Sequence, residues 1–236
     1  VHLAETYQIQ IEQENPENLQ ESNNKHEIYK INTYASNFYV KNLKNTKSAQ
    51  DYITSRGINS ESIEKFKLGY ARPAWHALYD SLKNKTTLID SCGLFGKRSN
   101  RVYDRLRDRI VFPIHDTQGR LSGFGGRSLS DDNMPKYLNS PDTPTFFKSN
   151  ILYGLYQCLQ AKKNEKIVIV EGYIDVIMMH QAGLPCAVAS LGTAFTTQHL
   201  KLAQRYALKE IVYCFDGDAA GQRAMQKAID TTLPLI

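Results

Sequence analysis

Three strand-like apolar runs, each followed at once by a helical pattern, constrain the fold of this chain most. The runs are KIVIV, CAVAS and EIVYCF, which begin at Lys166, Cys186 and Glu210. The segments after them, YIDVIMMHQAG, TTQHLKLAQRYA and AAGQRAMQKAI, space their apolar residues three and four apart, as amphipathic helices do. Strands that alternate with helices through short connections are typical of a parallel sheet covered by helices. We therefore predict an α/β subdomain over residues 153–236.

The chain before this unit has a different texture, which predicts an α+β subdomain over residues 29–152. Residues 29–93 have the period of short amphipathic helices, as in YASNFYVKNL. Two apolar strands, RIVFPIH and RLSGFGGRSL, then flank the turn Asp116–Gly119, which indicates a β-hairpin. Residues 131–154 are rich in Pro, Asn, Ser and Asp and predict a long surface loop. Residues 1–28 are polar and predict a linker of low order.

Composition limits the class of protein. The chain is 42% hydrophobic over 236 residues, which is enough for a sizeable core. It has no uninterrupted apolar run of 18 residues and no secretory pattern at its start, so we expect a protein inside the cell that is not bound to a membrane. The four cysteines are scattered and lack metal-ligand spacing, so we expect reduced core cysteines: Cys92, Cys158, Cys186 and Cys214.

The basic charge is concentrated in the middle of the chain. The net charge is +5, and residues 96–150 carry 10 Lys and Arg against 6 Asp and Glu. A local excess of this kind fits a polyanionic partner such as nucleic acid, and it fits a solvated basic face almost equally well.

Acidic residues follow the first and third strands of the α/β unit. Glu171 ends the first strand, and Asp216 and Asp218 end the third. Ligands of open parallel sheets bind beyond the carboxyl ends of the strands, so the three carboxylates converge if these strands are neighbours. Clustered carboxylates with water access favour Mg²⁺ or Mn²⁺ over zinc. Taken singly, Glu171 is better explained as an N-cap or first-turn acid, and Asp216 and Asp218 are explained equally well as helix caps. Together at matching strand ends, the three acids favour the metal site.

Other polar residues near these strand ends admit two interpretations each. Asp175, one turn beyond Glu171, either fixes a metal-bound water or forms a salt bridge with a neighbour. In SLGTAFT, Gly192 and Thr193 either present backbone N–H groups to an anion or form a turn in which Thr196 or Thr197 caps a helix.

Basic and aromatic residues upstream have the composition of a nucleic-acid groove. Arg127 ends the glycine-rich strand GFGGR, whose missing side chains would let a nucleic-acid strand come close. Lys136 offers a point charge, Tyr137 a stacking face and Asn139 a hydrogen-bonding amide. Each of them alone is also consistent with a solvated surface. His115 and His199 have no second ligand at metal spacing, and we expect core or surface roles for them.

Two families share acids of this kind. A strand ending in DxD also occurs in haloacid-dehalogenase-type phosphatases, but there it belongs to the first strand of the fold. A glutamate after the first strand with the Asp pair after the third resembles the Toprim domain. The series DRLRDRIVFPIHDTQGRLSGFGGR, PKYLNSPDTPTFFKSNILYGLY, IVIVEGYIDVI, SLGTAFT and FDGDAAGQRA resembles, in order and spacing, the polymerase core of bacterial DnaG-type primases over residues 30–236.

This resemblance implies a fold, a site and a reaction. It implies an α+β N-terminal subdomain followed by a Toprim parallel-sheet α/β subdomain, and metal-dependent synthesis of short RNA primers on single-stranded DNA. The implied active-site acids are Glu171, Asp175, Asp216 and Asp218, and metal ligation falls to Glu171, Asp216 and Asp218. The implied groove that handles template and nucleotide is formed by Arg127, Lys136, Tyr137 and Lys148, to which the residue chemistry adds Asn139.

The resemblance also implies partners and missing parts. The expected cofactor is Mg²⁺ or Mn²⁺, with zinc only in an upstream zinc-ribbon domain that is absent here. The expected partners are single-stranded DNA, ribonucleoside triphosphates and, through an absent C-terminal domain, the replicative helicase, at replication forks in the bacterial cytoplasm. The sequence ends before the last acidic Toprim motif, so we expect residues 1–236 alone to be weakly active or inactive.

Two rival functions fit the same residues. A Toprim nuclease or a phosphatase would use the same acids, and primer synthesis without cleavage would exclude it. A nucleic-acid-binding or scaffold module would bind independently of Mg²⁺ and of Glu171.

Overall fold

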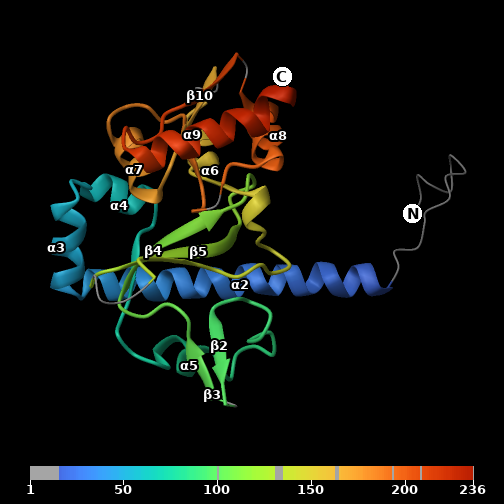
Figure 1. The fold of residues 1–236 in the computed structure, drawn as a ribbon. Coiled ribbons are helices and arrows are strands. Elements are labelled where there is room, and N and C mark those ends of the chain that lie inside the picture. Colours follow the sequence, from blue (N-terminus) through green and yellow to red (C-terminus); the bar gives the residue numbers. More distant parts are fainter. Residues whose placement is uncertain are drawn as a thin grey trace, which may run out of the picture.

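The computed structural model describes residues 16–99, 101–130, 135–162, 165–192, 194–207 and 209–235. Three parts follow one another along the molecule in Figure 1: an α/β module, an antiparallel sheet lying along one long helix, and a small hairpin with its own helix. The hairpin part, residues 77–104, is inserted in sequence between two strands of the antiparallel sheet, and the α/β module follows both from residue 152.

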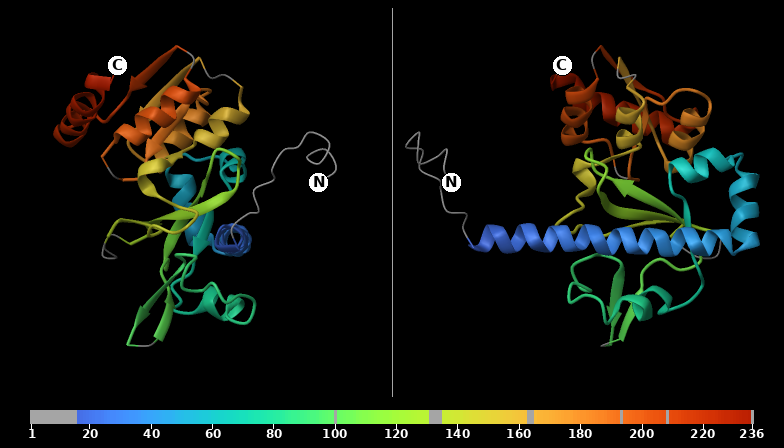
Figure 2. Two further views of the ribbon diagram at one scale, coloured as in Figure 1. Left: turned by 90° about the vertical axis from the view of Figure 1, so that its right-hand side faces the viewer. Right: turned by 180° about the vertical axis from the view of Figure 1, so that it is seen from behind.

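Helices dominate the first third of the chain, as the sequence predicts. They are α2 (Pro16–Lys44), α3 (Lys47–Ser55), α4 (Ser60–Lys65) and α5 (Ala77–Leu82). α2 begins within the segment predicted to be of low order, so that prediction is wrong for residues 16–28; residues 1–15 lie outside the described part. The N-terminal part of α2 projects beyond the body of the molecule (Figure 2), and residues 19–23 are exposed. Residues 16–27 of α2 are polar apart from Pro16 and Leu19, so this part gives no apolar period, although Pro16 at the first position is a favourable start.

The antiparallel sheet has the strand order β1-β4-β5-β6. Its strands are β1 (Gly69–Ala71), β4 (Arg109–His115), β5 (Leu121–Ser128) and β6 (Tyr137–Asn139). The predicted hairpin is confirmed: β4 pairs with β5, and Gly119 takes a φ of +81° in the turn. The predicted loop is wrong in part, because β6 lies inside it as an edge strand. Three residues are too few to give a period-2 signal.

The side chains of β4 alternate between two cores. Ile110, Phe112 and Ile114 pack in the core shared with the α/β module, whereas Val111 packs in the core formed with α2 and α5. This is the period of two that a strand buried on both faces must have. The antiparallel sheet is therefore the middle layer that fixes the α/β module relative to α2.

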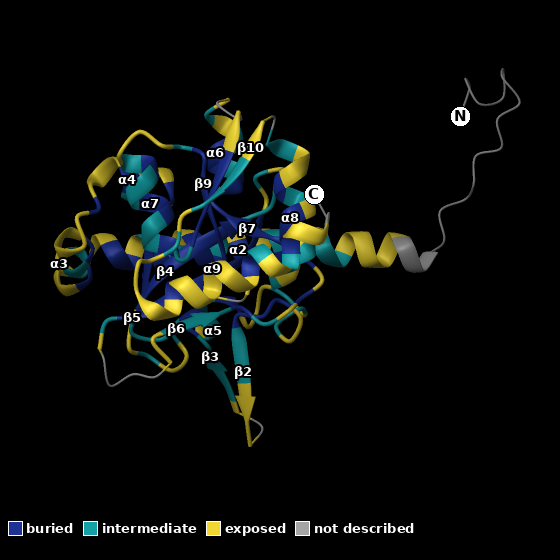
Figure 3. Ribbon diagram, turned by 45° about the horizontal axis from the view of Figure 1, so that its top comes forward, coloured by how far each residue is buried: buried dark blue, intermediate teal, exposed yellow. Residues whose placement is uncertain are grey.

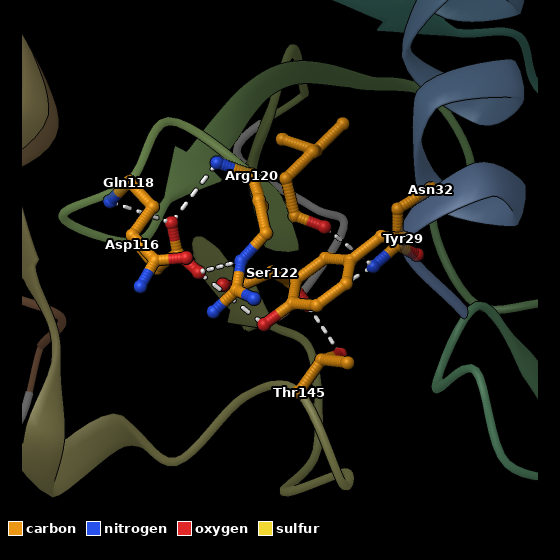
Figure 4. A network of polar contacts seen from close by, with 8 residues as sticks. Tyr29, Asn32, Asp116, Gln118, Arg120, Ser122 and Thr145 are labelled. Atoms are coloured by element: carbon orange, nitrogen blue, oxygen red, sulfur yellow. Dashed lines mark hydrogen bonds and ion pairs between the residues drawn. The ribbon is translucent and has the colours of Figure 1, made fainter. Parts of the chain in front are cut away.

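The long helix is held to the sheet by a buried amide (Figure 4). Asn32 is fully buried, and its Nδ2 donates to the backbone oxygens of Leu121 and Ser122, each at 3.0 Å. Tyr29, one turn earlier, donates its hydroxyl to Asp116 at 3.3 Å. Both contacts fall at the start of β5 and on the hairpin turn, so α2 and the hairpin are docked together at this point.

The α/β module confirms the predicted alternation. Its sheet has the order β10-β8-β9-β7, in which β10 (Glu210–Tyr213), β8 (Lys166–Val170) and β9 (Ala187–Ser190) are parallel and β7 (Leu152–Tyr153) is antiparallel. Its helices are α6 (Leu155–Gln160), α7 (Tyr173–Gln181), α8 (Thr197–Tyr206) and α9 (Ala219–Thr232), and the short 3₁₀ helices η1 (Lys148–Asn150) and η2 (Leu233–Leu235) flank the module. One face of α9 is open to solvent (Figure 3).

A small hairpin of β2 (Phe95–Arg98) and β3 (Arg101–Asp104) completes the fold; the sequence analysis did not predict it. Cys92, Cys158 and Cys186 are buried as expected, but Cys214 is exposed, so its assignment to the core is wrong. It lies just after β10, the edge strand of its sheet, where one side of the chain faces solvent. No helix within the described residues is long and apolar enough to cross a membrane.

We expect Asn32→Ala to lower the free energy of unfolding by about 1–3 kcal/mol, because it removes both hydrogen bonds of a fully buried amide. Asn37→Ala, an exposed change on the same helix, is the control and should stay within about 0.5 kcal/mol of the wild type. Urea unfolding measures both. Equal stability of the two variants would show that the amide does not dock α2.

Candidate active site at the strand ends

Parallel pairing of β8 with β10 brings two of the acids together. Ile169 is the register partner of Tyr213, so Glu171 and Asp216 leave adjacent strands at nearly the same level. The backbone N–H of Asp216 donates to Glu171 Oε1 at 2.8 Å. The condition set by the sequence, that the first and third strands be neighbours, is therefore met.

The missing side chain of Gly221 makes room for the Glu171 carboxylate. A Cβ at Gly221 would lie 2.6 Å from Glu171 Oε1 and 2.3 Å from the backbone oxygen of Asp216. Both distances are shorter than a real Cβ contact, so only glycine fits here without movement. Gly221 thus lets the first turn of α9 close on the two strand ends.

Asp218 is the N-cap of α9. Its Oδ1 accepts from the backbone N–H groups of Ala220 at 2.9 Å and Gly221 at 2.8 Å. The helix-cap interpretation of Asp218 is therefore confirmed, which leaves its Oδ2 as the oxygen that could meet a ligand. Its place in the metal site stays a prediction.

Asp175 lies in the first turn of α7, and its Oδ2 accepts from the backbone N–H of Gly172, the N-cap residue, at 2.9 Å. Burial raises the pKa of Asp175, and the negative charge of Asp216 raises it further, although the Gly172 hydrogen bond and Arg127 act to lower it. Asp175 and Asp216 are therefore close enough to repel each other, which places Asp175 at the edge of the acidic cluster.

The opposite wall is a stack of cations and aromatic rings. The Arg127 guanidinium lies 5.7 Å from the ring centre of Tyr52 and 5.2 Å from that of Tyr137, and it donates to the Tyr137 hydroxyl at 2.5 Å. The Arg56 guanidinium also lies over Tyr52, 5.2 Å from its ring centre. Cation–π contacts of this kind hold a guanidinium in place while leaving its charge available. Tyr137 and Asn139 lie on β6 rather than in the predicted loop.

A cleft of about 440 Å³ lies between the two walls. It brings together most of the predicted residues: Glu171, Asp175, Asp216, Arg127, Lys136, Tyr137 and Asn139. It does not include Asp218 or Lys148; Lys148 is half-buried on η1, and its backbone oxygen bonds to His199. The sequence analysis missed Arg56 and Tyr173, which also line the cleft. The motif IVIVEGYIDVI contained Tyr173, whereas no local signal marked Arg56.

The loop after β9 adopts the capping alternative. Thr196 is the N-cap of α8 and accepts from the backbone N–H of His199 at 3.2 Å. The N–H of Gly192 donates to the Ser190 backbone oxygen at 2.7 Å, so it is not free for an anion, and Thr193 lies outside the described residues. His199 is fully buried, as a core histidine should be.

The donors at the acidic wall suit a hard divalent cation in chemical type. They are carboxylate oxygens beside an open cleft, and Mg²⁺ is commonly held by one or two carboxylates together with water and substrate phosphates. Within the described residues, no three His, Cys, Asp or Glu side chains converge on one point. We therefore expect the ion to be held by the adjacent pair Glu171 and Asp216 together with water and phosphate, and not by a closed site of three acids.

A parallel sheet with acids at its strand ends has the arrangement of a Toprim domain, and comparison with known proteins identifies the family. The model of the Toprim domain matches residues 165–235, and the model described as DNA primase catalytic core, N-terminal domain, matches residues 38–159. The chain belongs to this DNA primase catalytic core family.

Relatives and solved structures agree with the family models. The DNA primase of Legionella pneumophila is 45% identical over 88% of this chain and 36% of its own length. A DNA primase domain from Pseudomonas aeruginosa superposes with a TM-score of 0.83 at 42% identity, covering 88% of this chain and 67% of that one. A DnaG primase catalytic domain bound to ssDNA superposes with a TM-score of 0.81 at 38% identity, covering 91% and 68%. The chain spans about a third of the length of the Legionella relative.

We expect Gly221→Ala to destabilise the protein by roughly 1–3 kcal/mol, because its Cβ would collide with the Asp216 backbone and the Glu171 carboxylate. This outcome opposes helix propensity, which favours alanine over glycine. Gly217→Ala is the matched control, since a Cβ there meets nothing within 4 Å. Thermal and urea unfolding measure both variants, and a stabilised Gly221→Ala would refute the close approach.

Proposed function

We propose that this chain forms the catalytic core of a bacterial DNA primase, which synthesises short RNA primers on single-stranded DNA by nucleotidyl transfer. The observation that carries the proposal is the cleft with carboxylates on one wall and stacked cations on the other. A ssDNA-bound relative with the same fold supports the choice of substrate. In the reaction, the 3′-hydroxyl of a ribonucleotide attacks the α-phosphate of the incoming triphosphate, and pyrophosphate leaves.

Each wall has a distinct part in this proposal. Arg127 and Lys136 hold phosphate oxygens of template or nucleotide, and Tyr137 keeps the Arg127 guanidinium facing the cleft through its hydroxyl and ring. Glu171 and Asp216 present carboxylate oxygens at the strand ends, fixed by the backbone hydrogen bond between them. Asp175 adds negative charge at the same wall.

Glu171 and Asp216 would hold a Mg²⁺ or Mn²⁺ ion, with Asp218 reaching it through its uncommitted oxygen. Such an ion neutralises charge on the phosphates and makes the attacking hydroxyl more acidic. The missing side chain of Gly221 supports this assignment, because it leaves the space in which the Glu171 carboxylate lies beside Asp216.

The remaining assignments follow from the same proposal. Residues 29–152 would act as the basic subdomain and residues 153–236 as the Toprim subdomain, with ribonucleoside triphosphates as substrates and the replicative helicase as the partner at bacterial replication forks. Lys148, which is half-buried on η1, would contact nucleic acid outside the cleft.

In the full-length parent protein, we expect Glu171→Gln and Asp216→Asn to lower primer synthesis by about 100-fold or more, because each removes a charge at the reacting phosphate. DNA affinity and the melting temperature should change little. The assay measures RNA made from ribonucleotides on single-stranded DNA with Mg²⁺.

The control is Glu210→Gln, an exposed acid at the other end of β10. Activity that survives in both site variants would reject the catalytic assignment. Cleavage of the DNA in place of synthesis would favour a Toprim nuclease.

We expect Arg127→Ala and Lys136→Ala each to weaken binding of single-stranded DNA and to reduce the slope of log K against log salt by about one, since each lost phosphate contact retains a counterion. Lys166→Ala, an exposed change at the far end of β8, should leave affinity and slope unchanged. Fluorescence anisotropy at several salt concentrations measures them, and an unchanged slope in both cleft variants would contradict the assignment.

A further inference from the structure

The amide of Asn139 is engaged at both ends. Its Oδ1 accepts from the Tyr173 hydroxyl at 2.7 Å, and its Nδ2 donates to the backbone oxygen of Leu191 at 2.5 Å. Asn139 lies on β6 of the antiparallel sheet, whereas Tyr173 and Leu191 belong to the α/β module, 34 and 52 residues away in sequence. One side chain therefore joins the two parts that form the walls of the cleft.

The two partners fix the orientation of this amide. A backbone oxygen can only accept, so the Asn139 NH₂ group must face Leu191, and its oxygen is left for the Tyr173 hydroxyl. A tyrosine hydroxyl has an ordinary pKa of about 10, so it is protonated at neutral pH and can donate. The network has one self-consistent arrangement.

Tyr173 is itself held tightly. Its ring stacks on Phe112 at 4.8 Å and meets Tyr153 edge-on at 4.7 Å, and only 4% of the residue is exposed. A Cβ at Gly125 would lie 2.3 Å from this ring, so the glycine of β5 makes the space that Tyr173 fills. The hydroxyl is thereby aimed at β6 by packing from both modules.

The network lies close in sequence to both walls. Tyr173 is two residues after Glu171, and Asn139 is two residues after Tyr137 and three after Lys136. A shift of β6 relative to α7 would therefore change the separation between cations and carboxylates. Misplacement of reacting groups by about 1 Å can cost about 100-fold in rate.

We infer that Asn139 and Tyr173 are positioning residues that lock the cationic edge strand β6 to the acidic strand ends, and that Asn139 does not act mainly as a ligand for nucleic acid. This inference rests on the proposed function, because the positioned groups are those of the primase site. It replaces the direct binding role that residue chemistry alone gives to Asn139.

The test is a double-mutant cycle in the full-length protein with Tyr173→Phe, Asn139→Leu and the pair. Tyr173→Phe keeps the ring and removes only the hydroxyl, so we expect kcat for primer synthesis to fall about 10-fold. The KM for nucleotides and the Kd for single-stranded DNA should stay within about twofold. The double variant should be no less active than Asn139→Leu alone, because both single changes break the same hydrogen bond between Tyr173 and Asn139.

Tyr39→Phe is the matched control, since the Tyr39 hydroxyl is buried in the α2 core and has no hydrogen-bond partner within the described residues. It should behave as wild type. Hydrogen exchange gives a readout that does not depend on activity: residues 186–192 should exchange faster in Tyr173→Phe and Asn139→Leu, and not in the control.

Wild-type kcat and wild-type exchange in Tyr173→Phe would overturn the inference. A severalfold rise in the Kd or KM of Asn139→Leu with no effect of Tyr173→Phe would also overturn it, because Asn139 would then be a ligand. A wild-type protein that makes no primers would reject the proposed function, and the exchange data would still decide whether the network locks the two modules.

Discussion

Parallel pairing of β8 with β10 is the constraint on which the site depends. It places Glu171 beside Asp216 although 45 residues separate them, and it allows the Asp216 N–H to bond the Glu171 carboxylate. A shift of one residue in this register would turn one of the two side chains to the other face of the sheet. The acidic wall is thus a product of sheet register, and the space left by the missing side chain of Gly221 completes it.

The cationic wall depends on packing between the antiparallel sheet and the α/β module. β4 directs Ile110, Phe112 and Ile114 into the core shared with that module, so the sheet that carries Arg127 cannot move freely against the strand ends. The hydrogen bonds of Asn139 define the position further at the mouth of the cleft. Apolar burial thus holds the two walls together, and directional hydrogen bonds set their alignment.

The sequence predicted the parts of this site that local patterns encode. Strand runs such as KIVIV are β-branched and mostly buried. The acids follow these runs directly, so they must lie at the edge of the sheet where the strands end. It did not predict β6, because three residues carry no period, or the helical start of α2, which has no apolar face. Arg56 was missed because only the fold brings the end of α3 to the cleft. Asn139 was assigned by its chemistry, and only the structure shows that both ends of its amide are already bonded.

The charges of the two walls stay largely separate, and this separation matters for the proposed chemistry. For Asp175, the repulsion from Asp216 affects the pKa more than the attraction of Arg127 does. Among the described residues, no salt bridge joins Arg127 or Lys136 to Glu171, Asp175 or Asp216, although both walls line a single cleft. Arg127 is instead held by Tyr52 and Tyr137, whose neutral rings keep the guanidinium in place without cancelling its charge. A site built in this way keeps an attraction for phosphate on one wall and for a metal cation on the other, which are the two charges that a nucleoside triphosphate with its bound ion brings together.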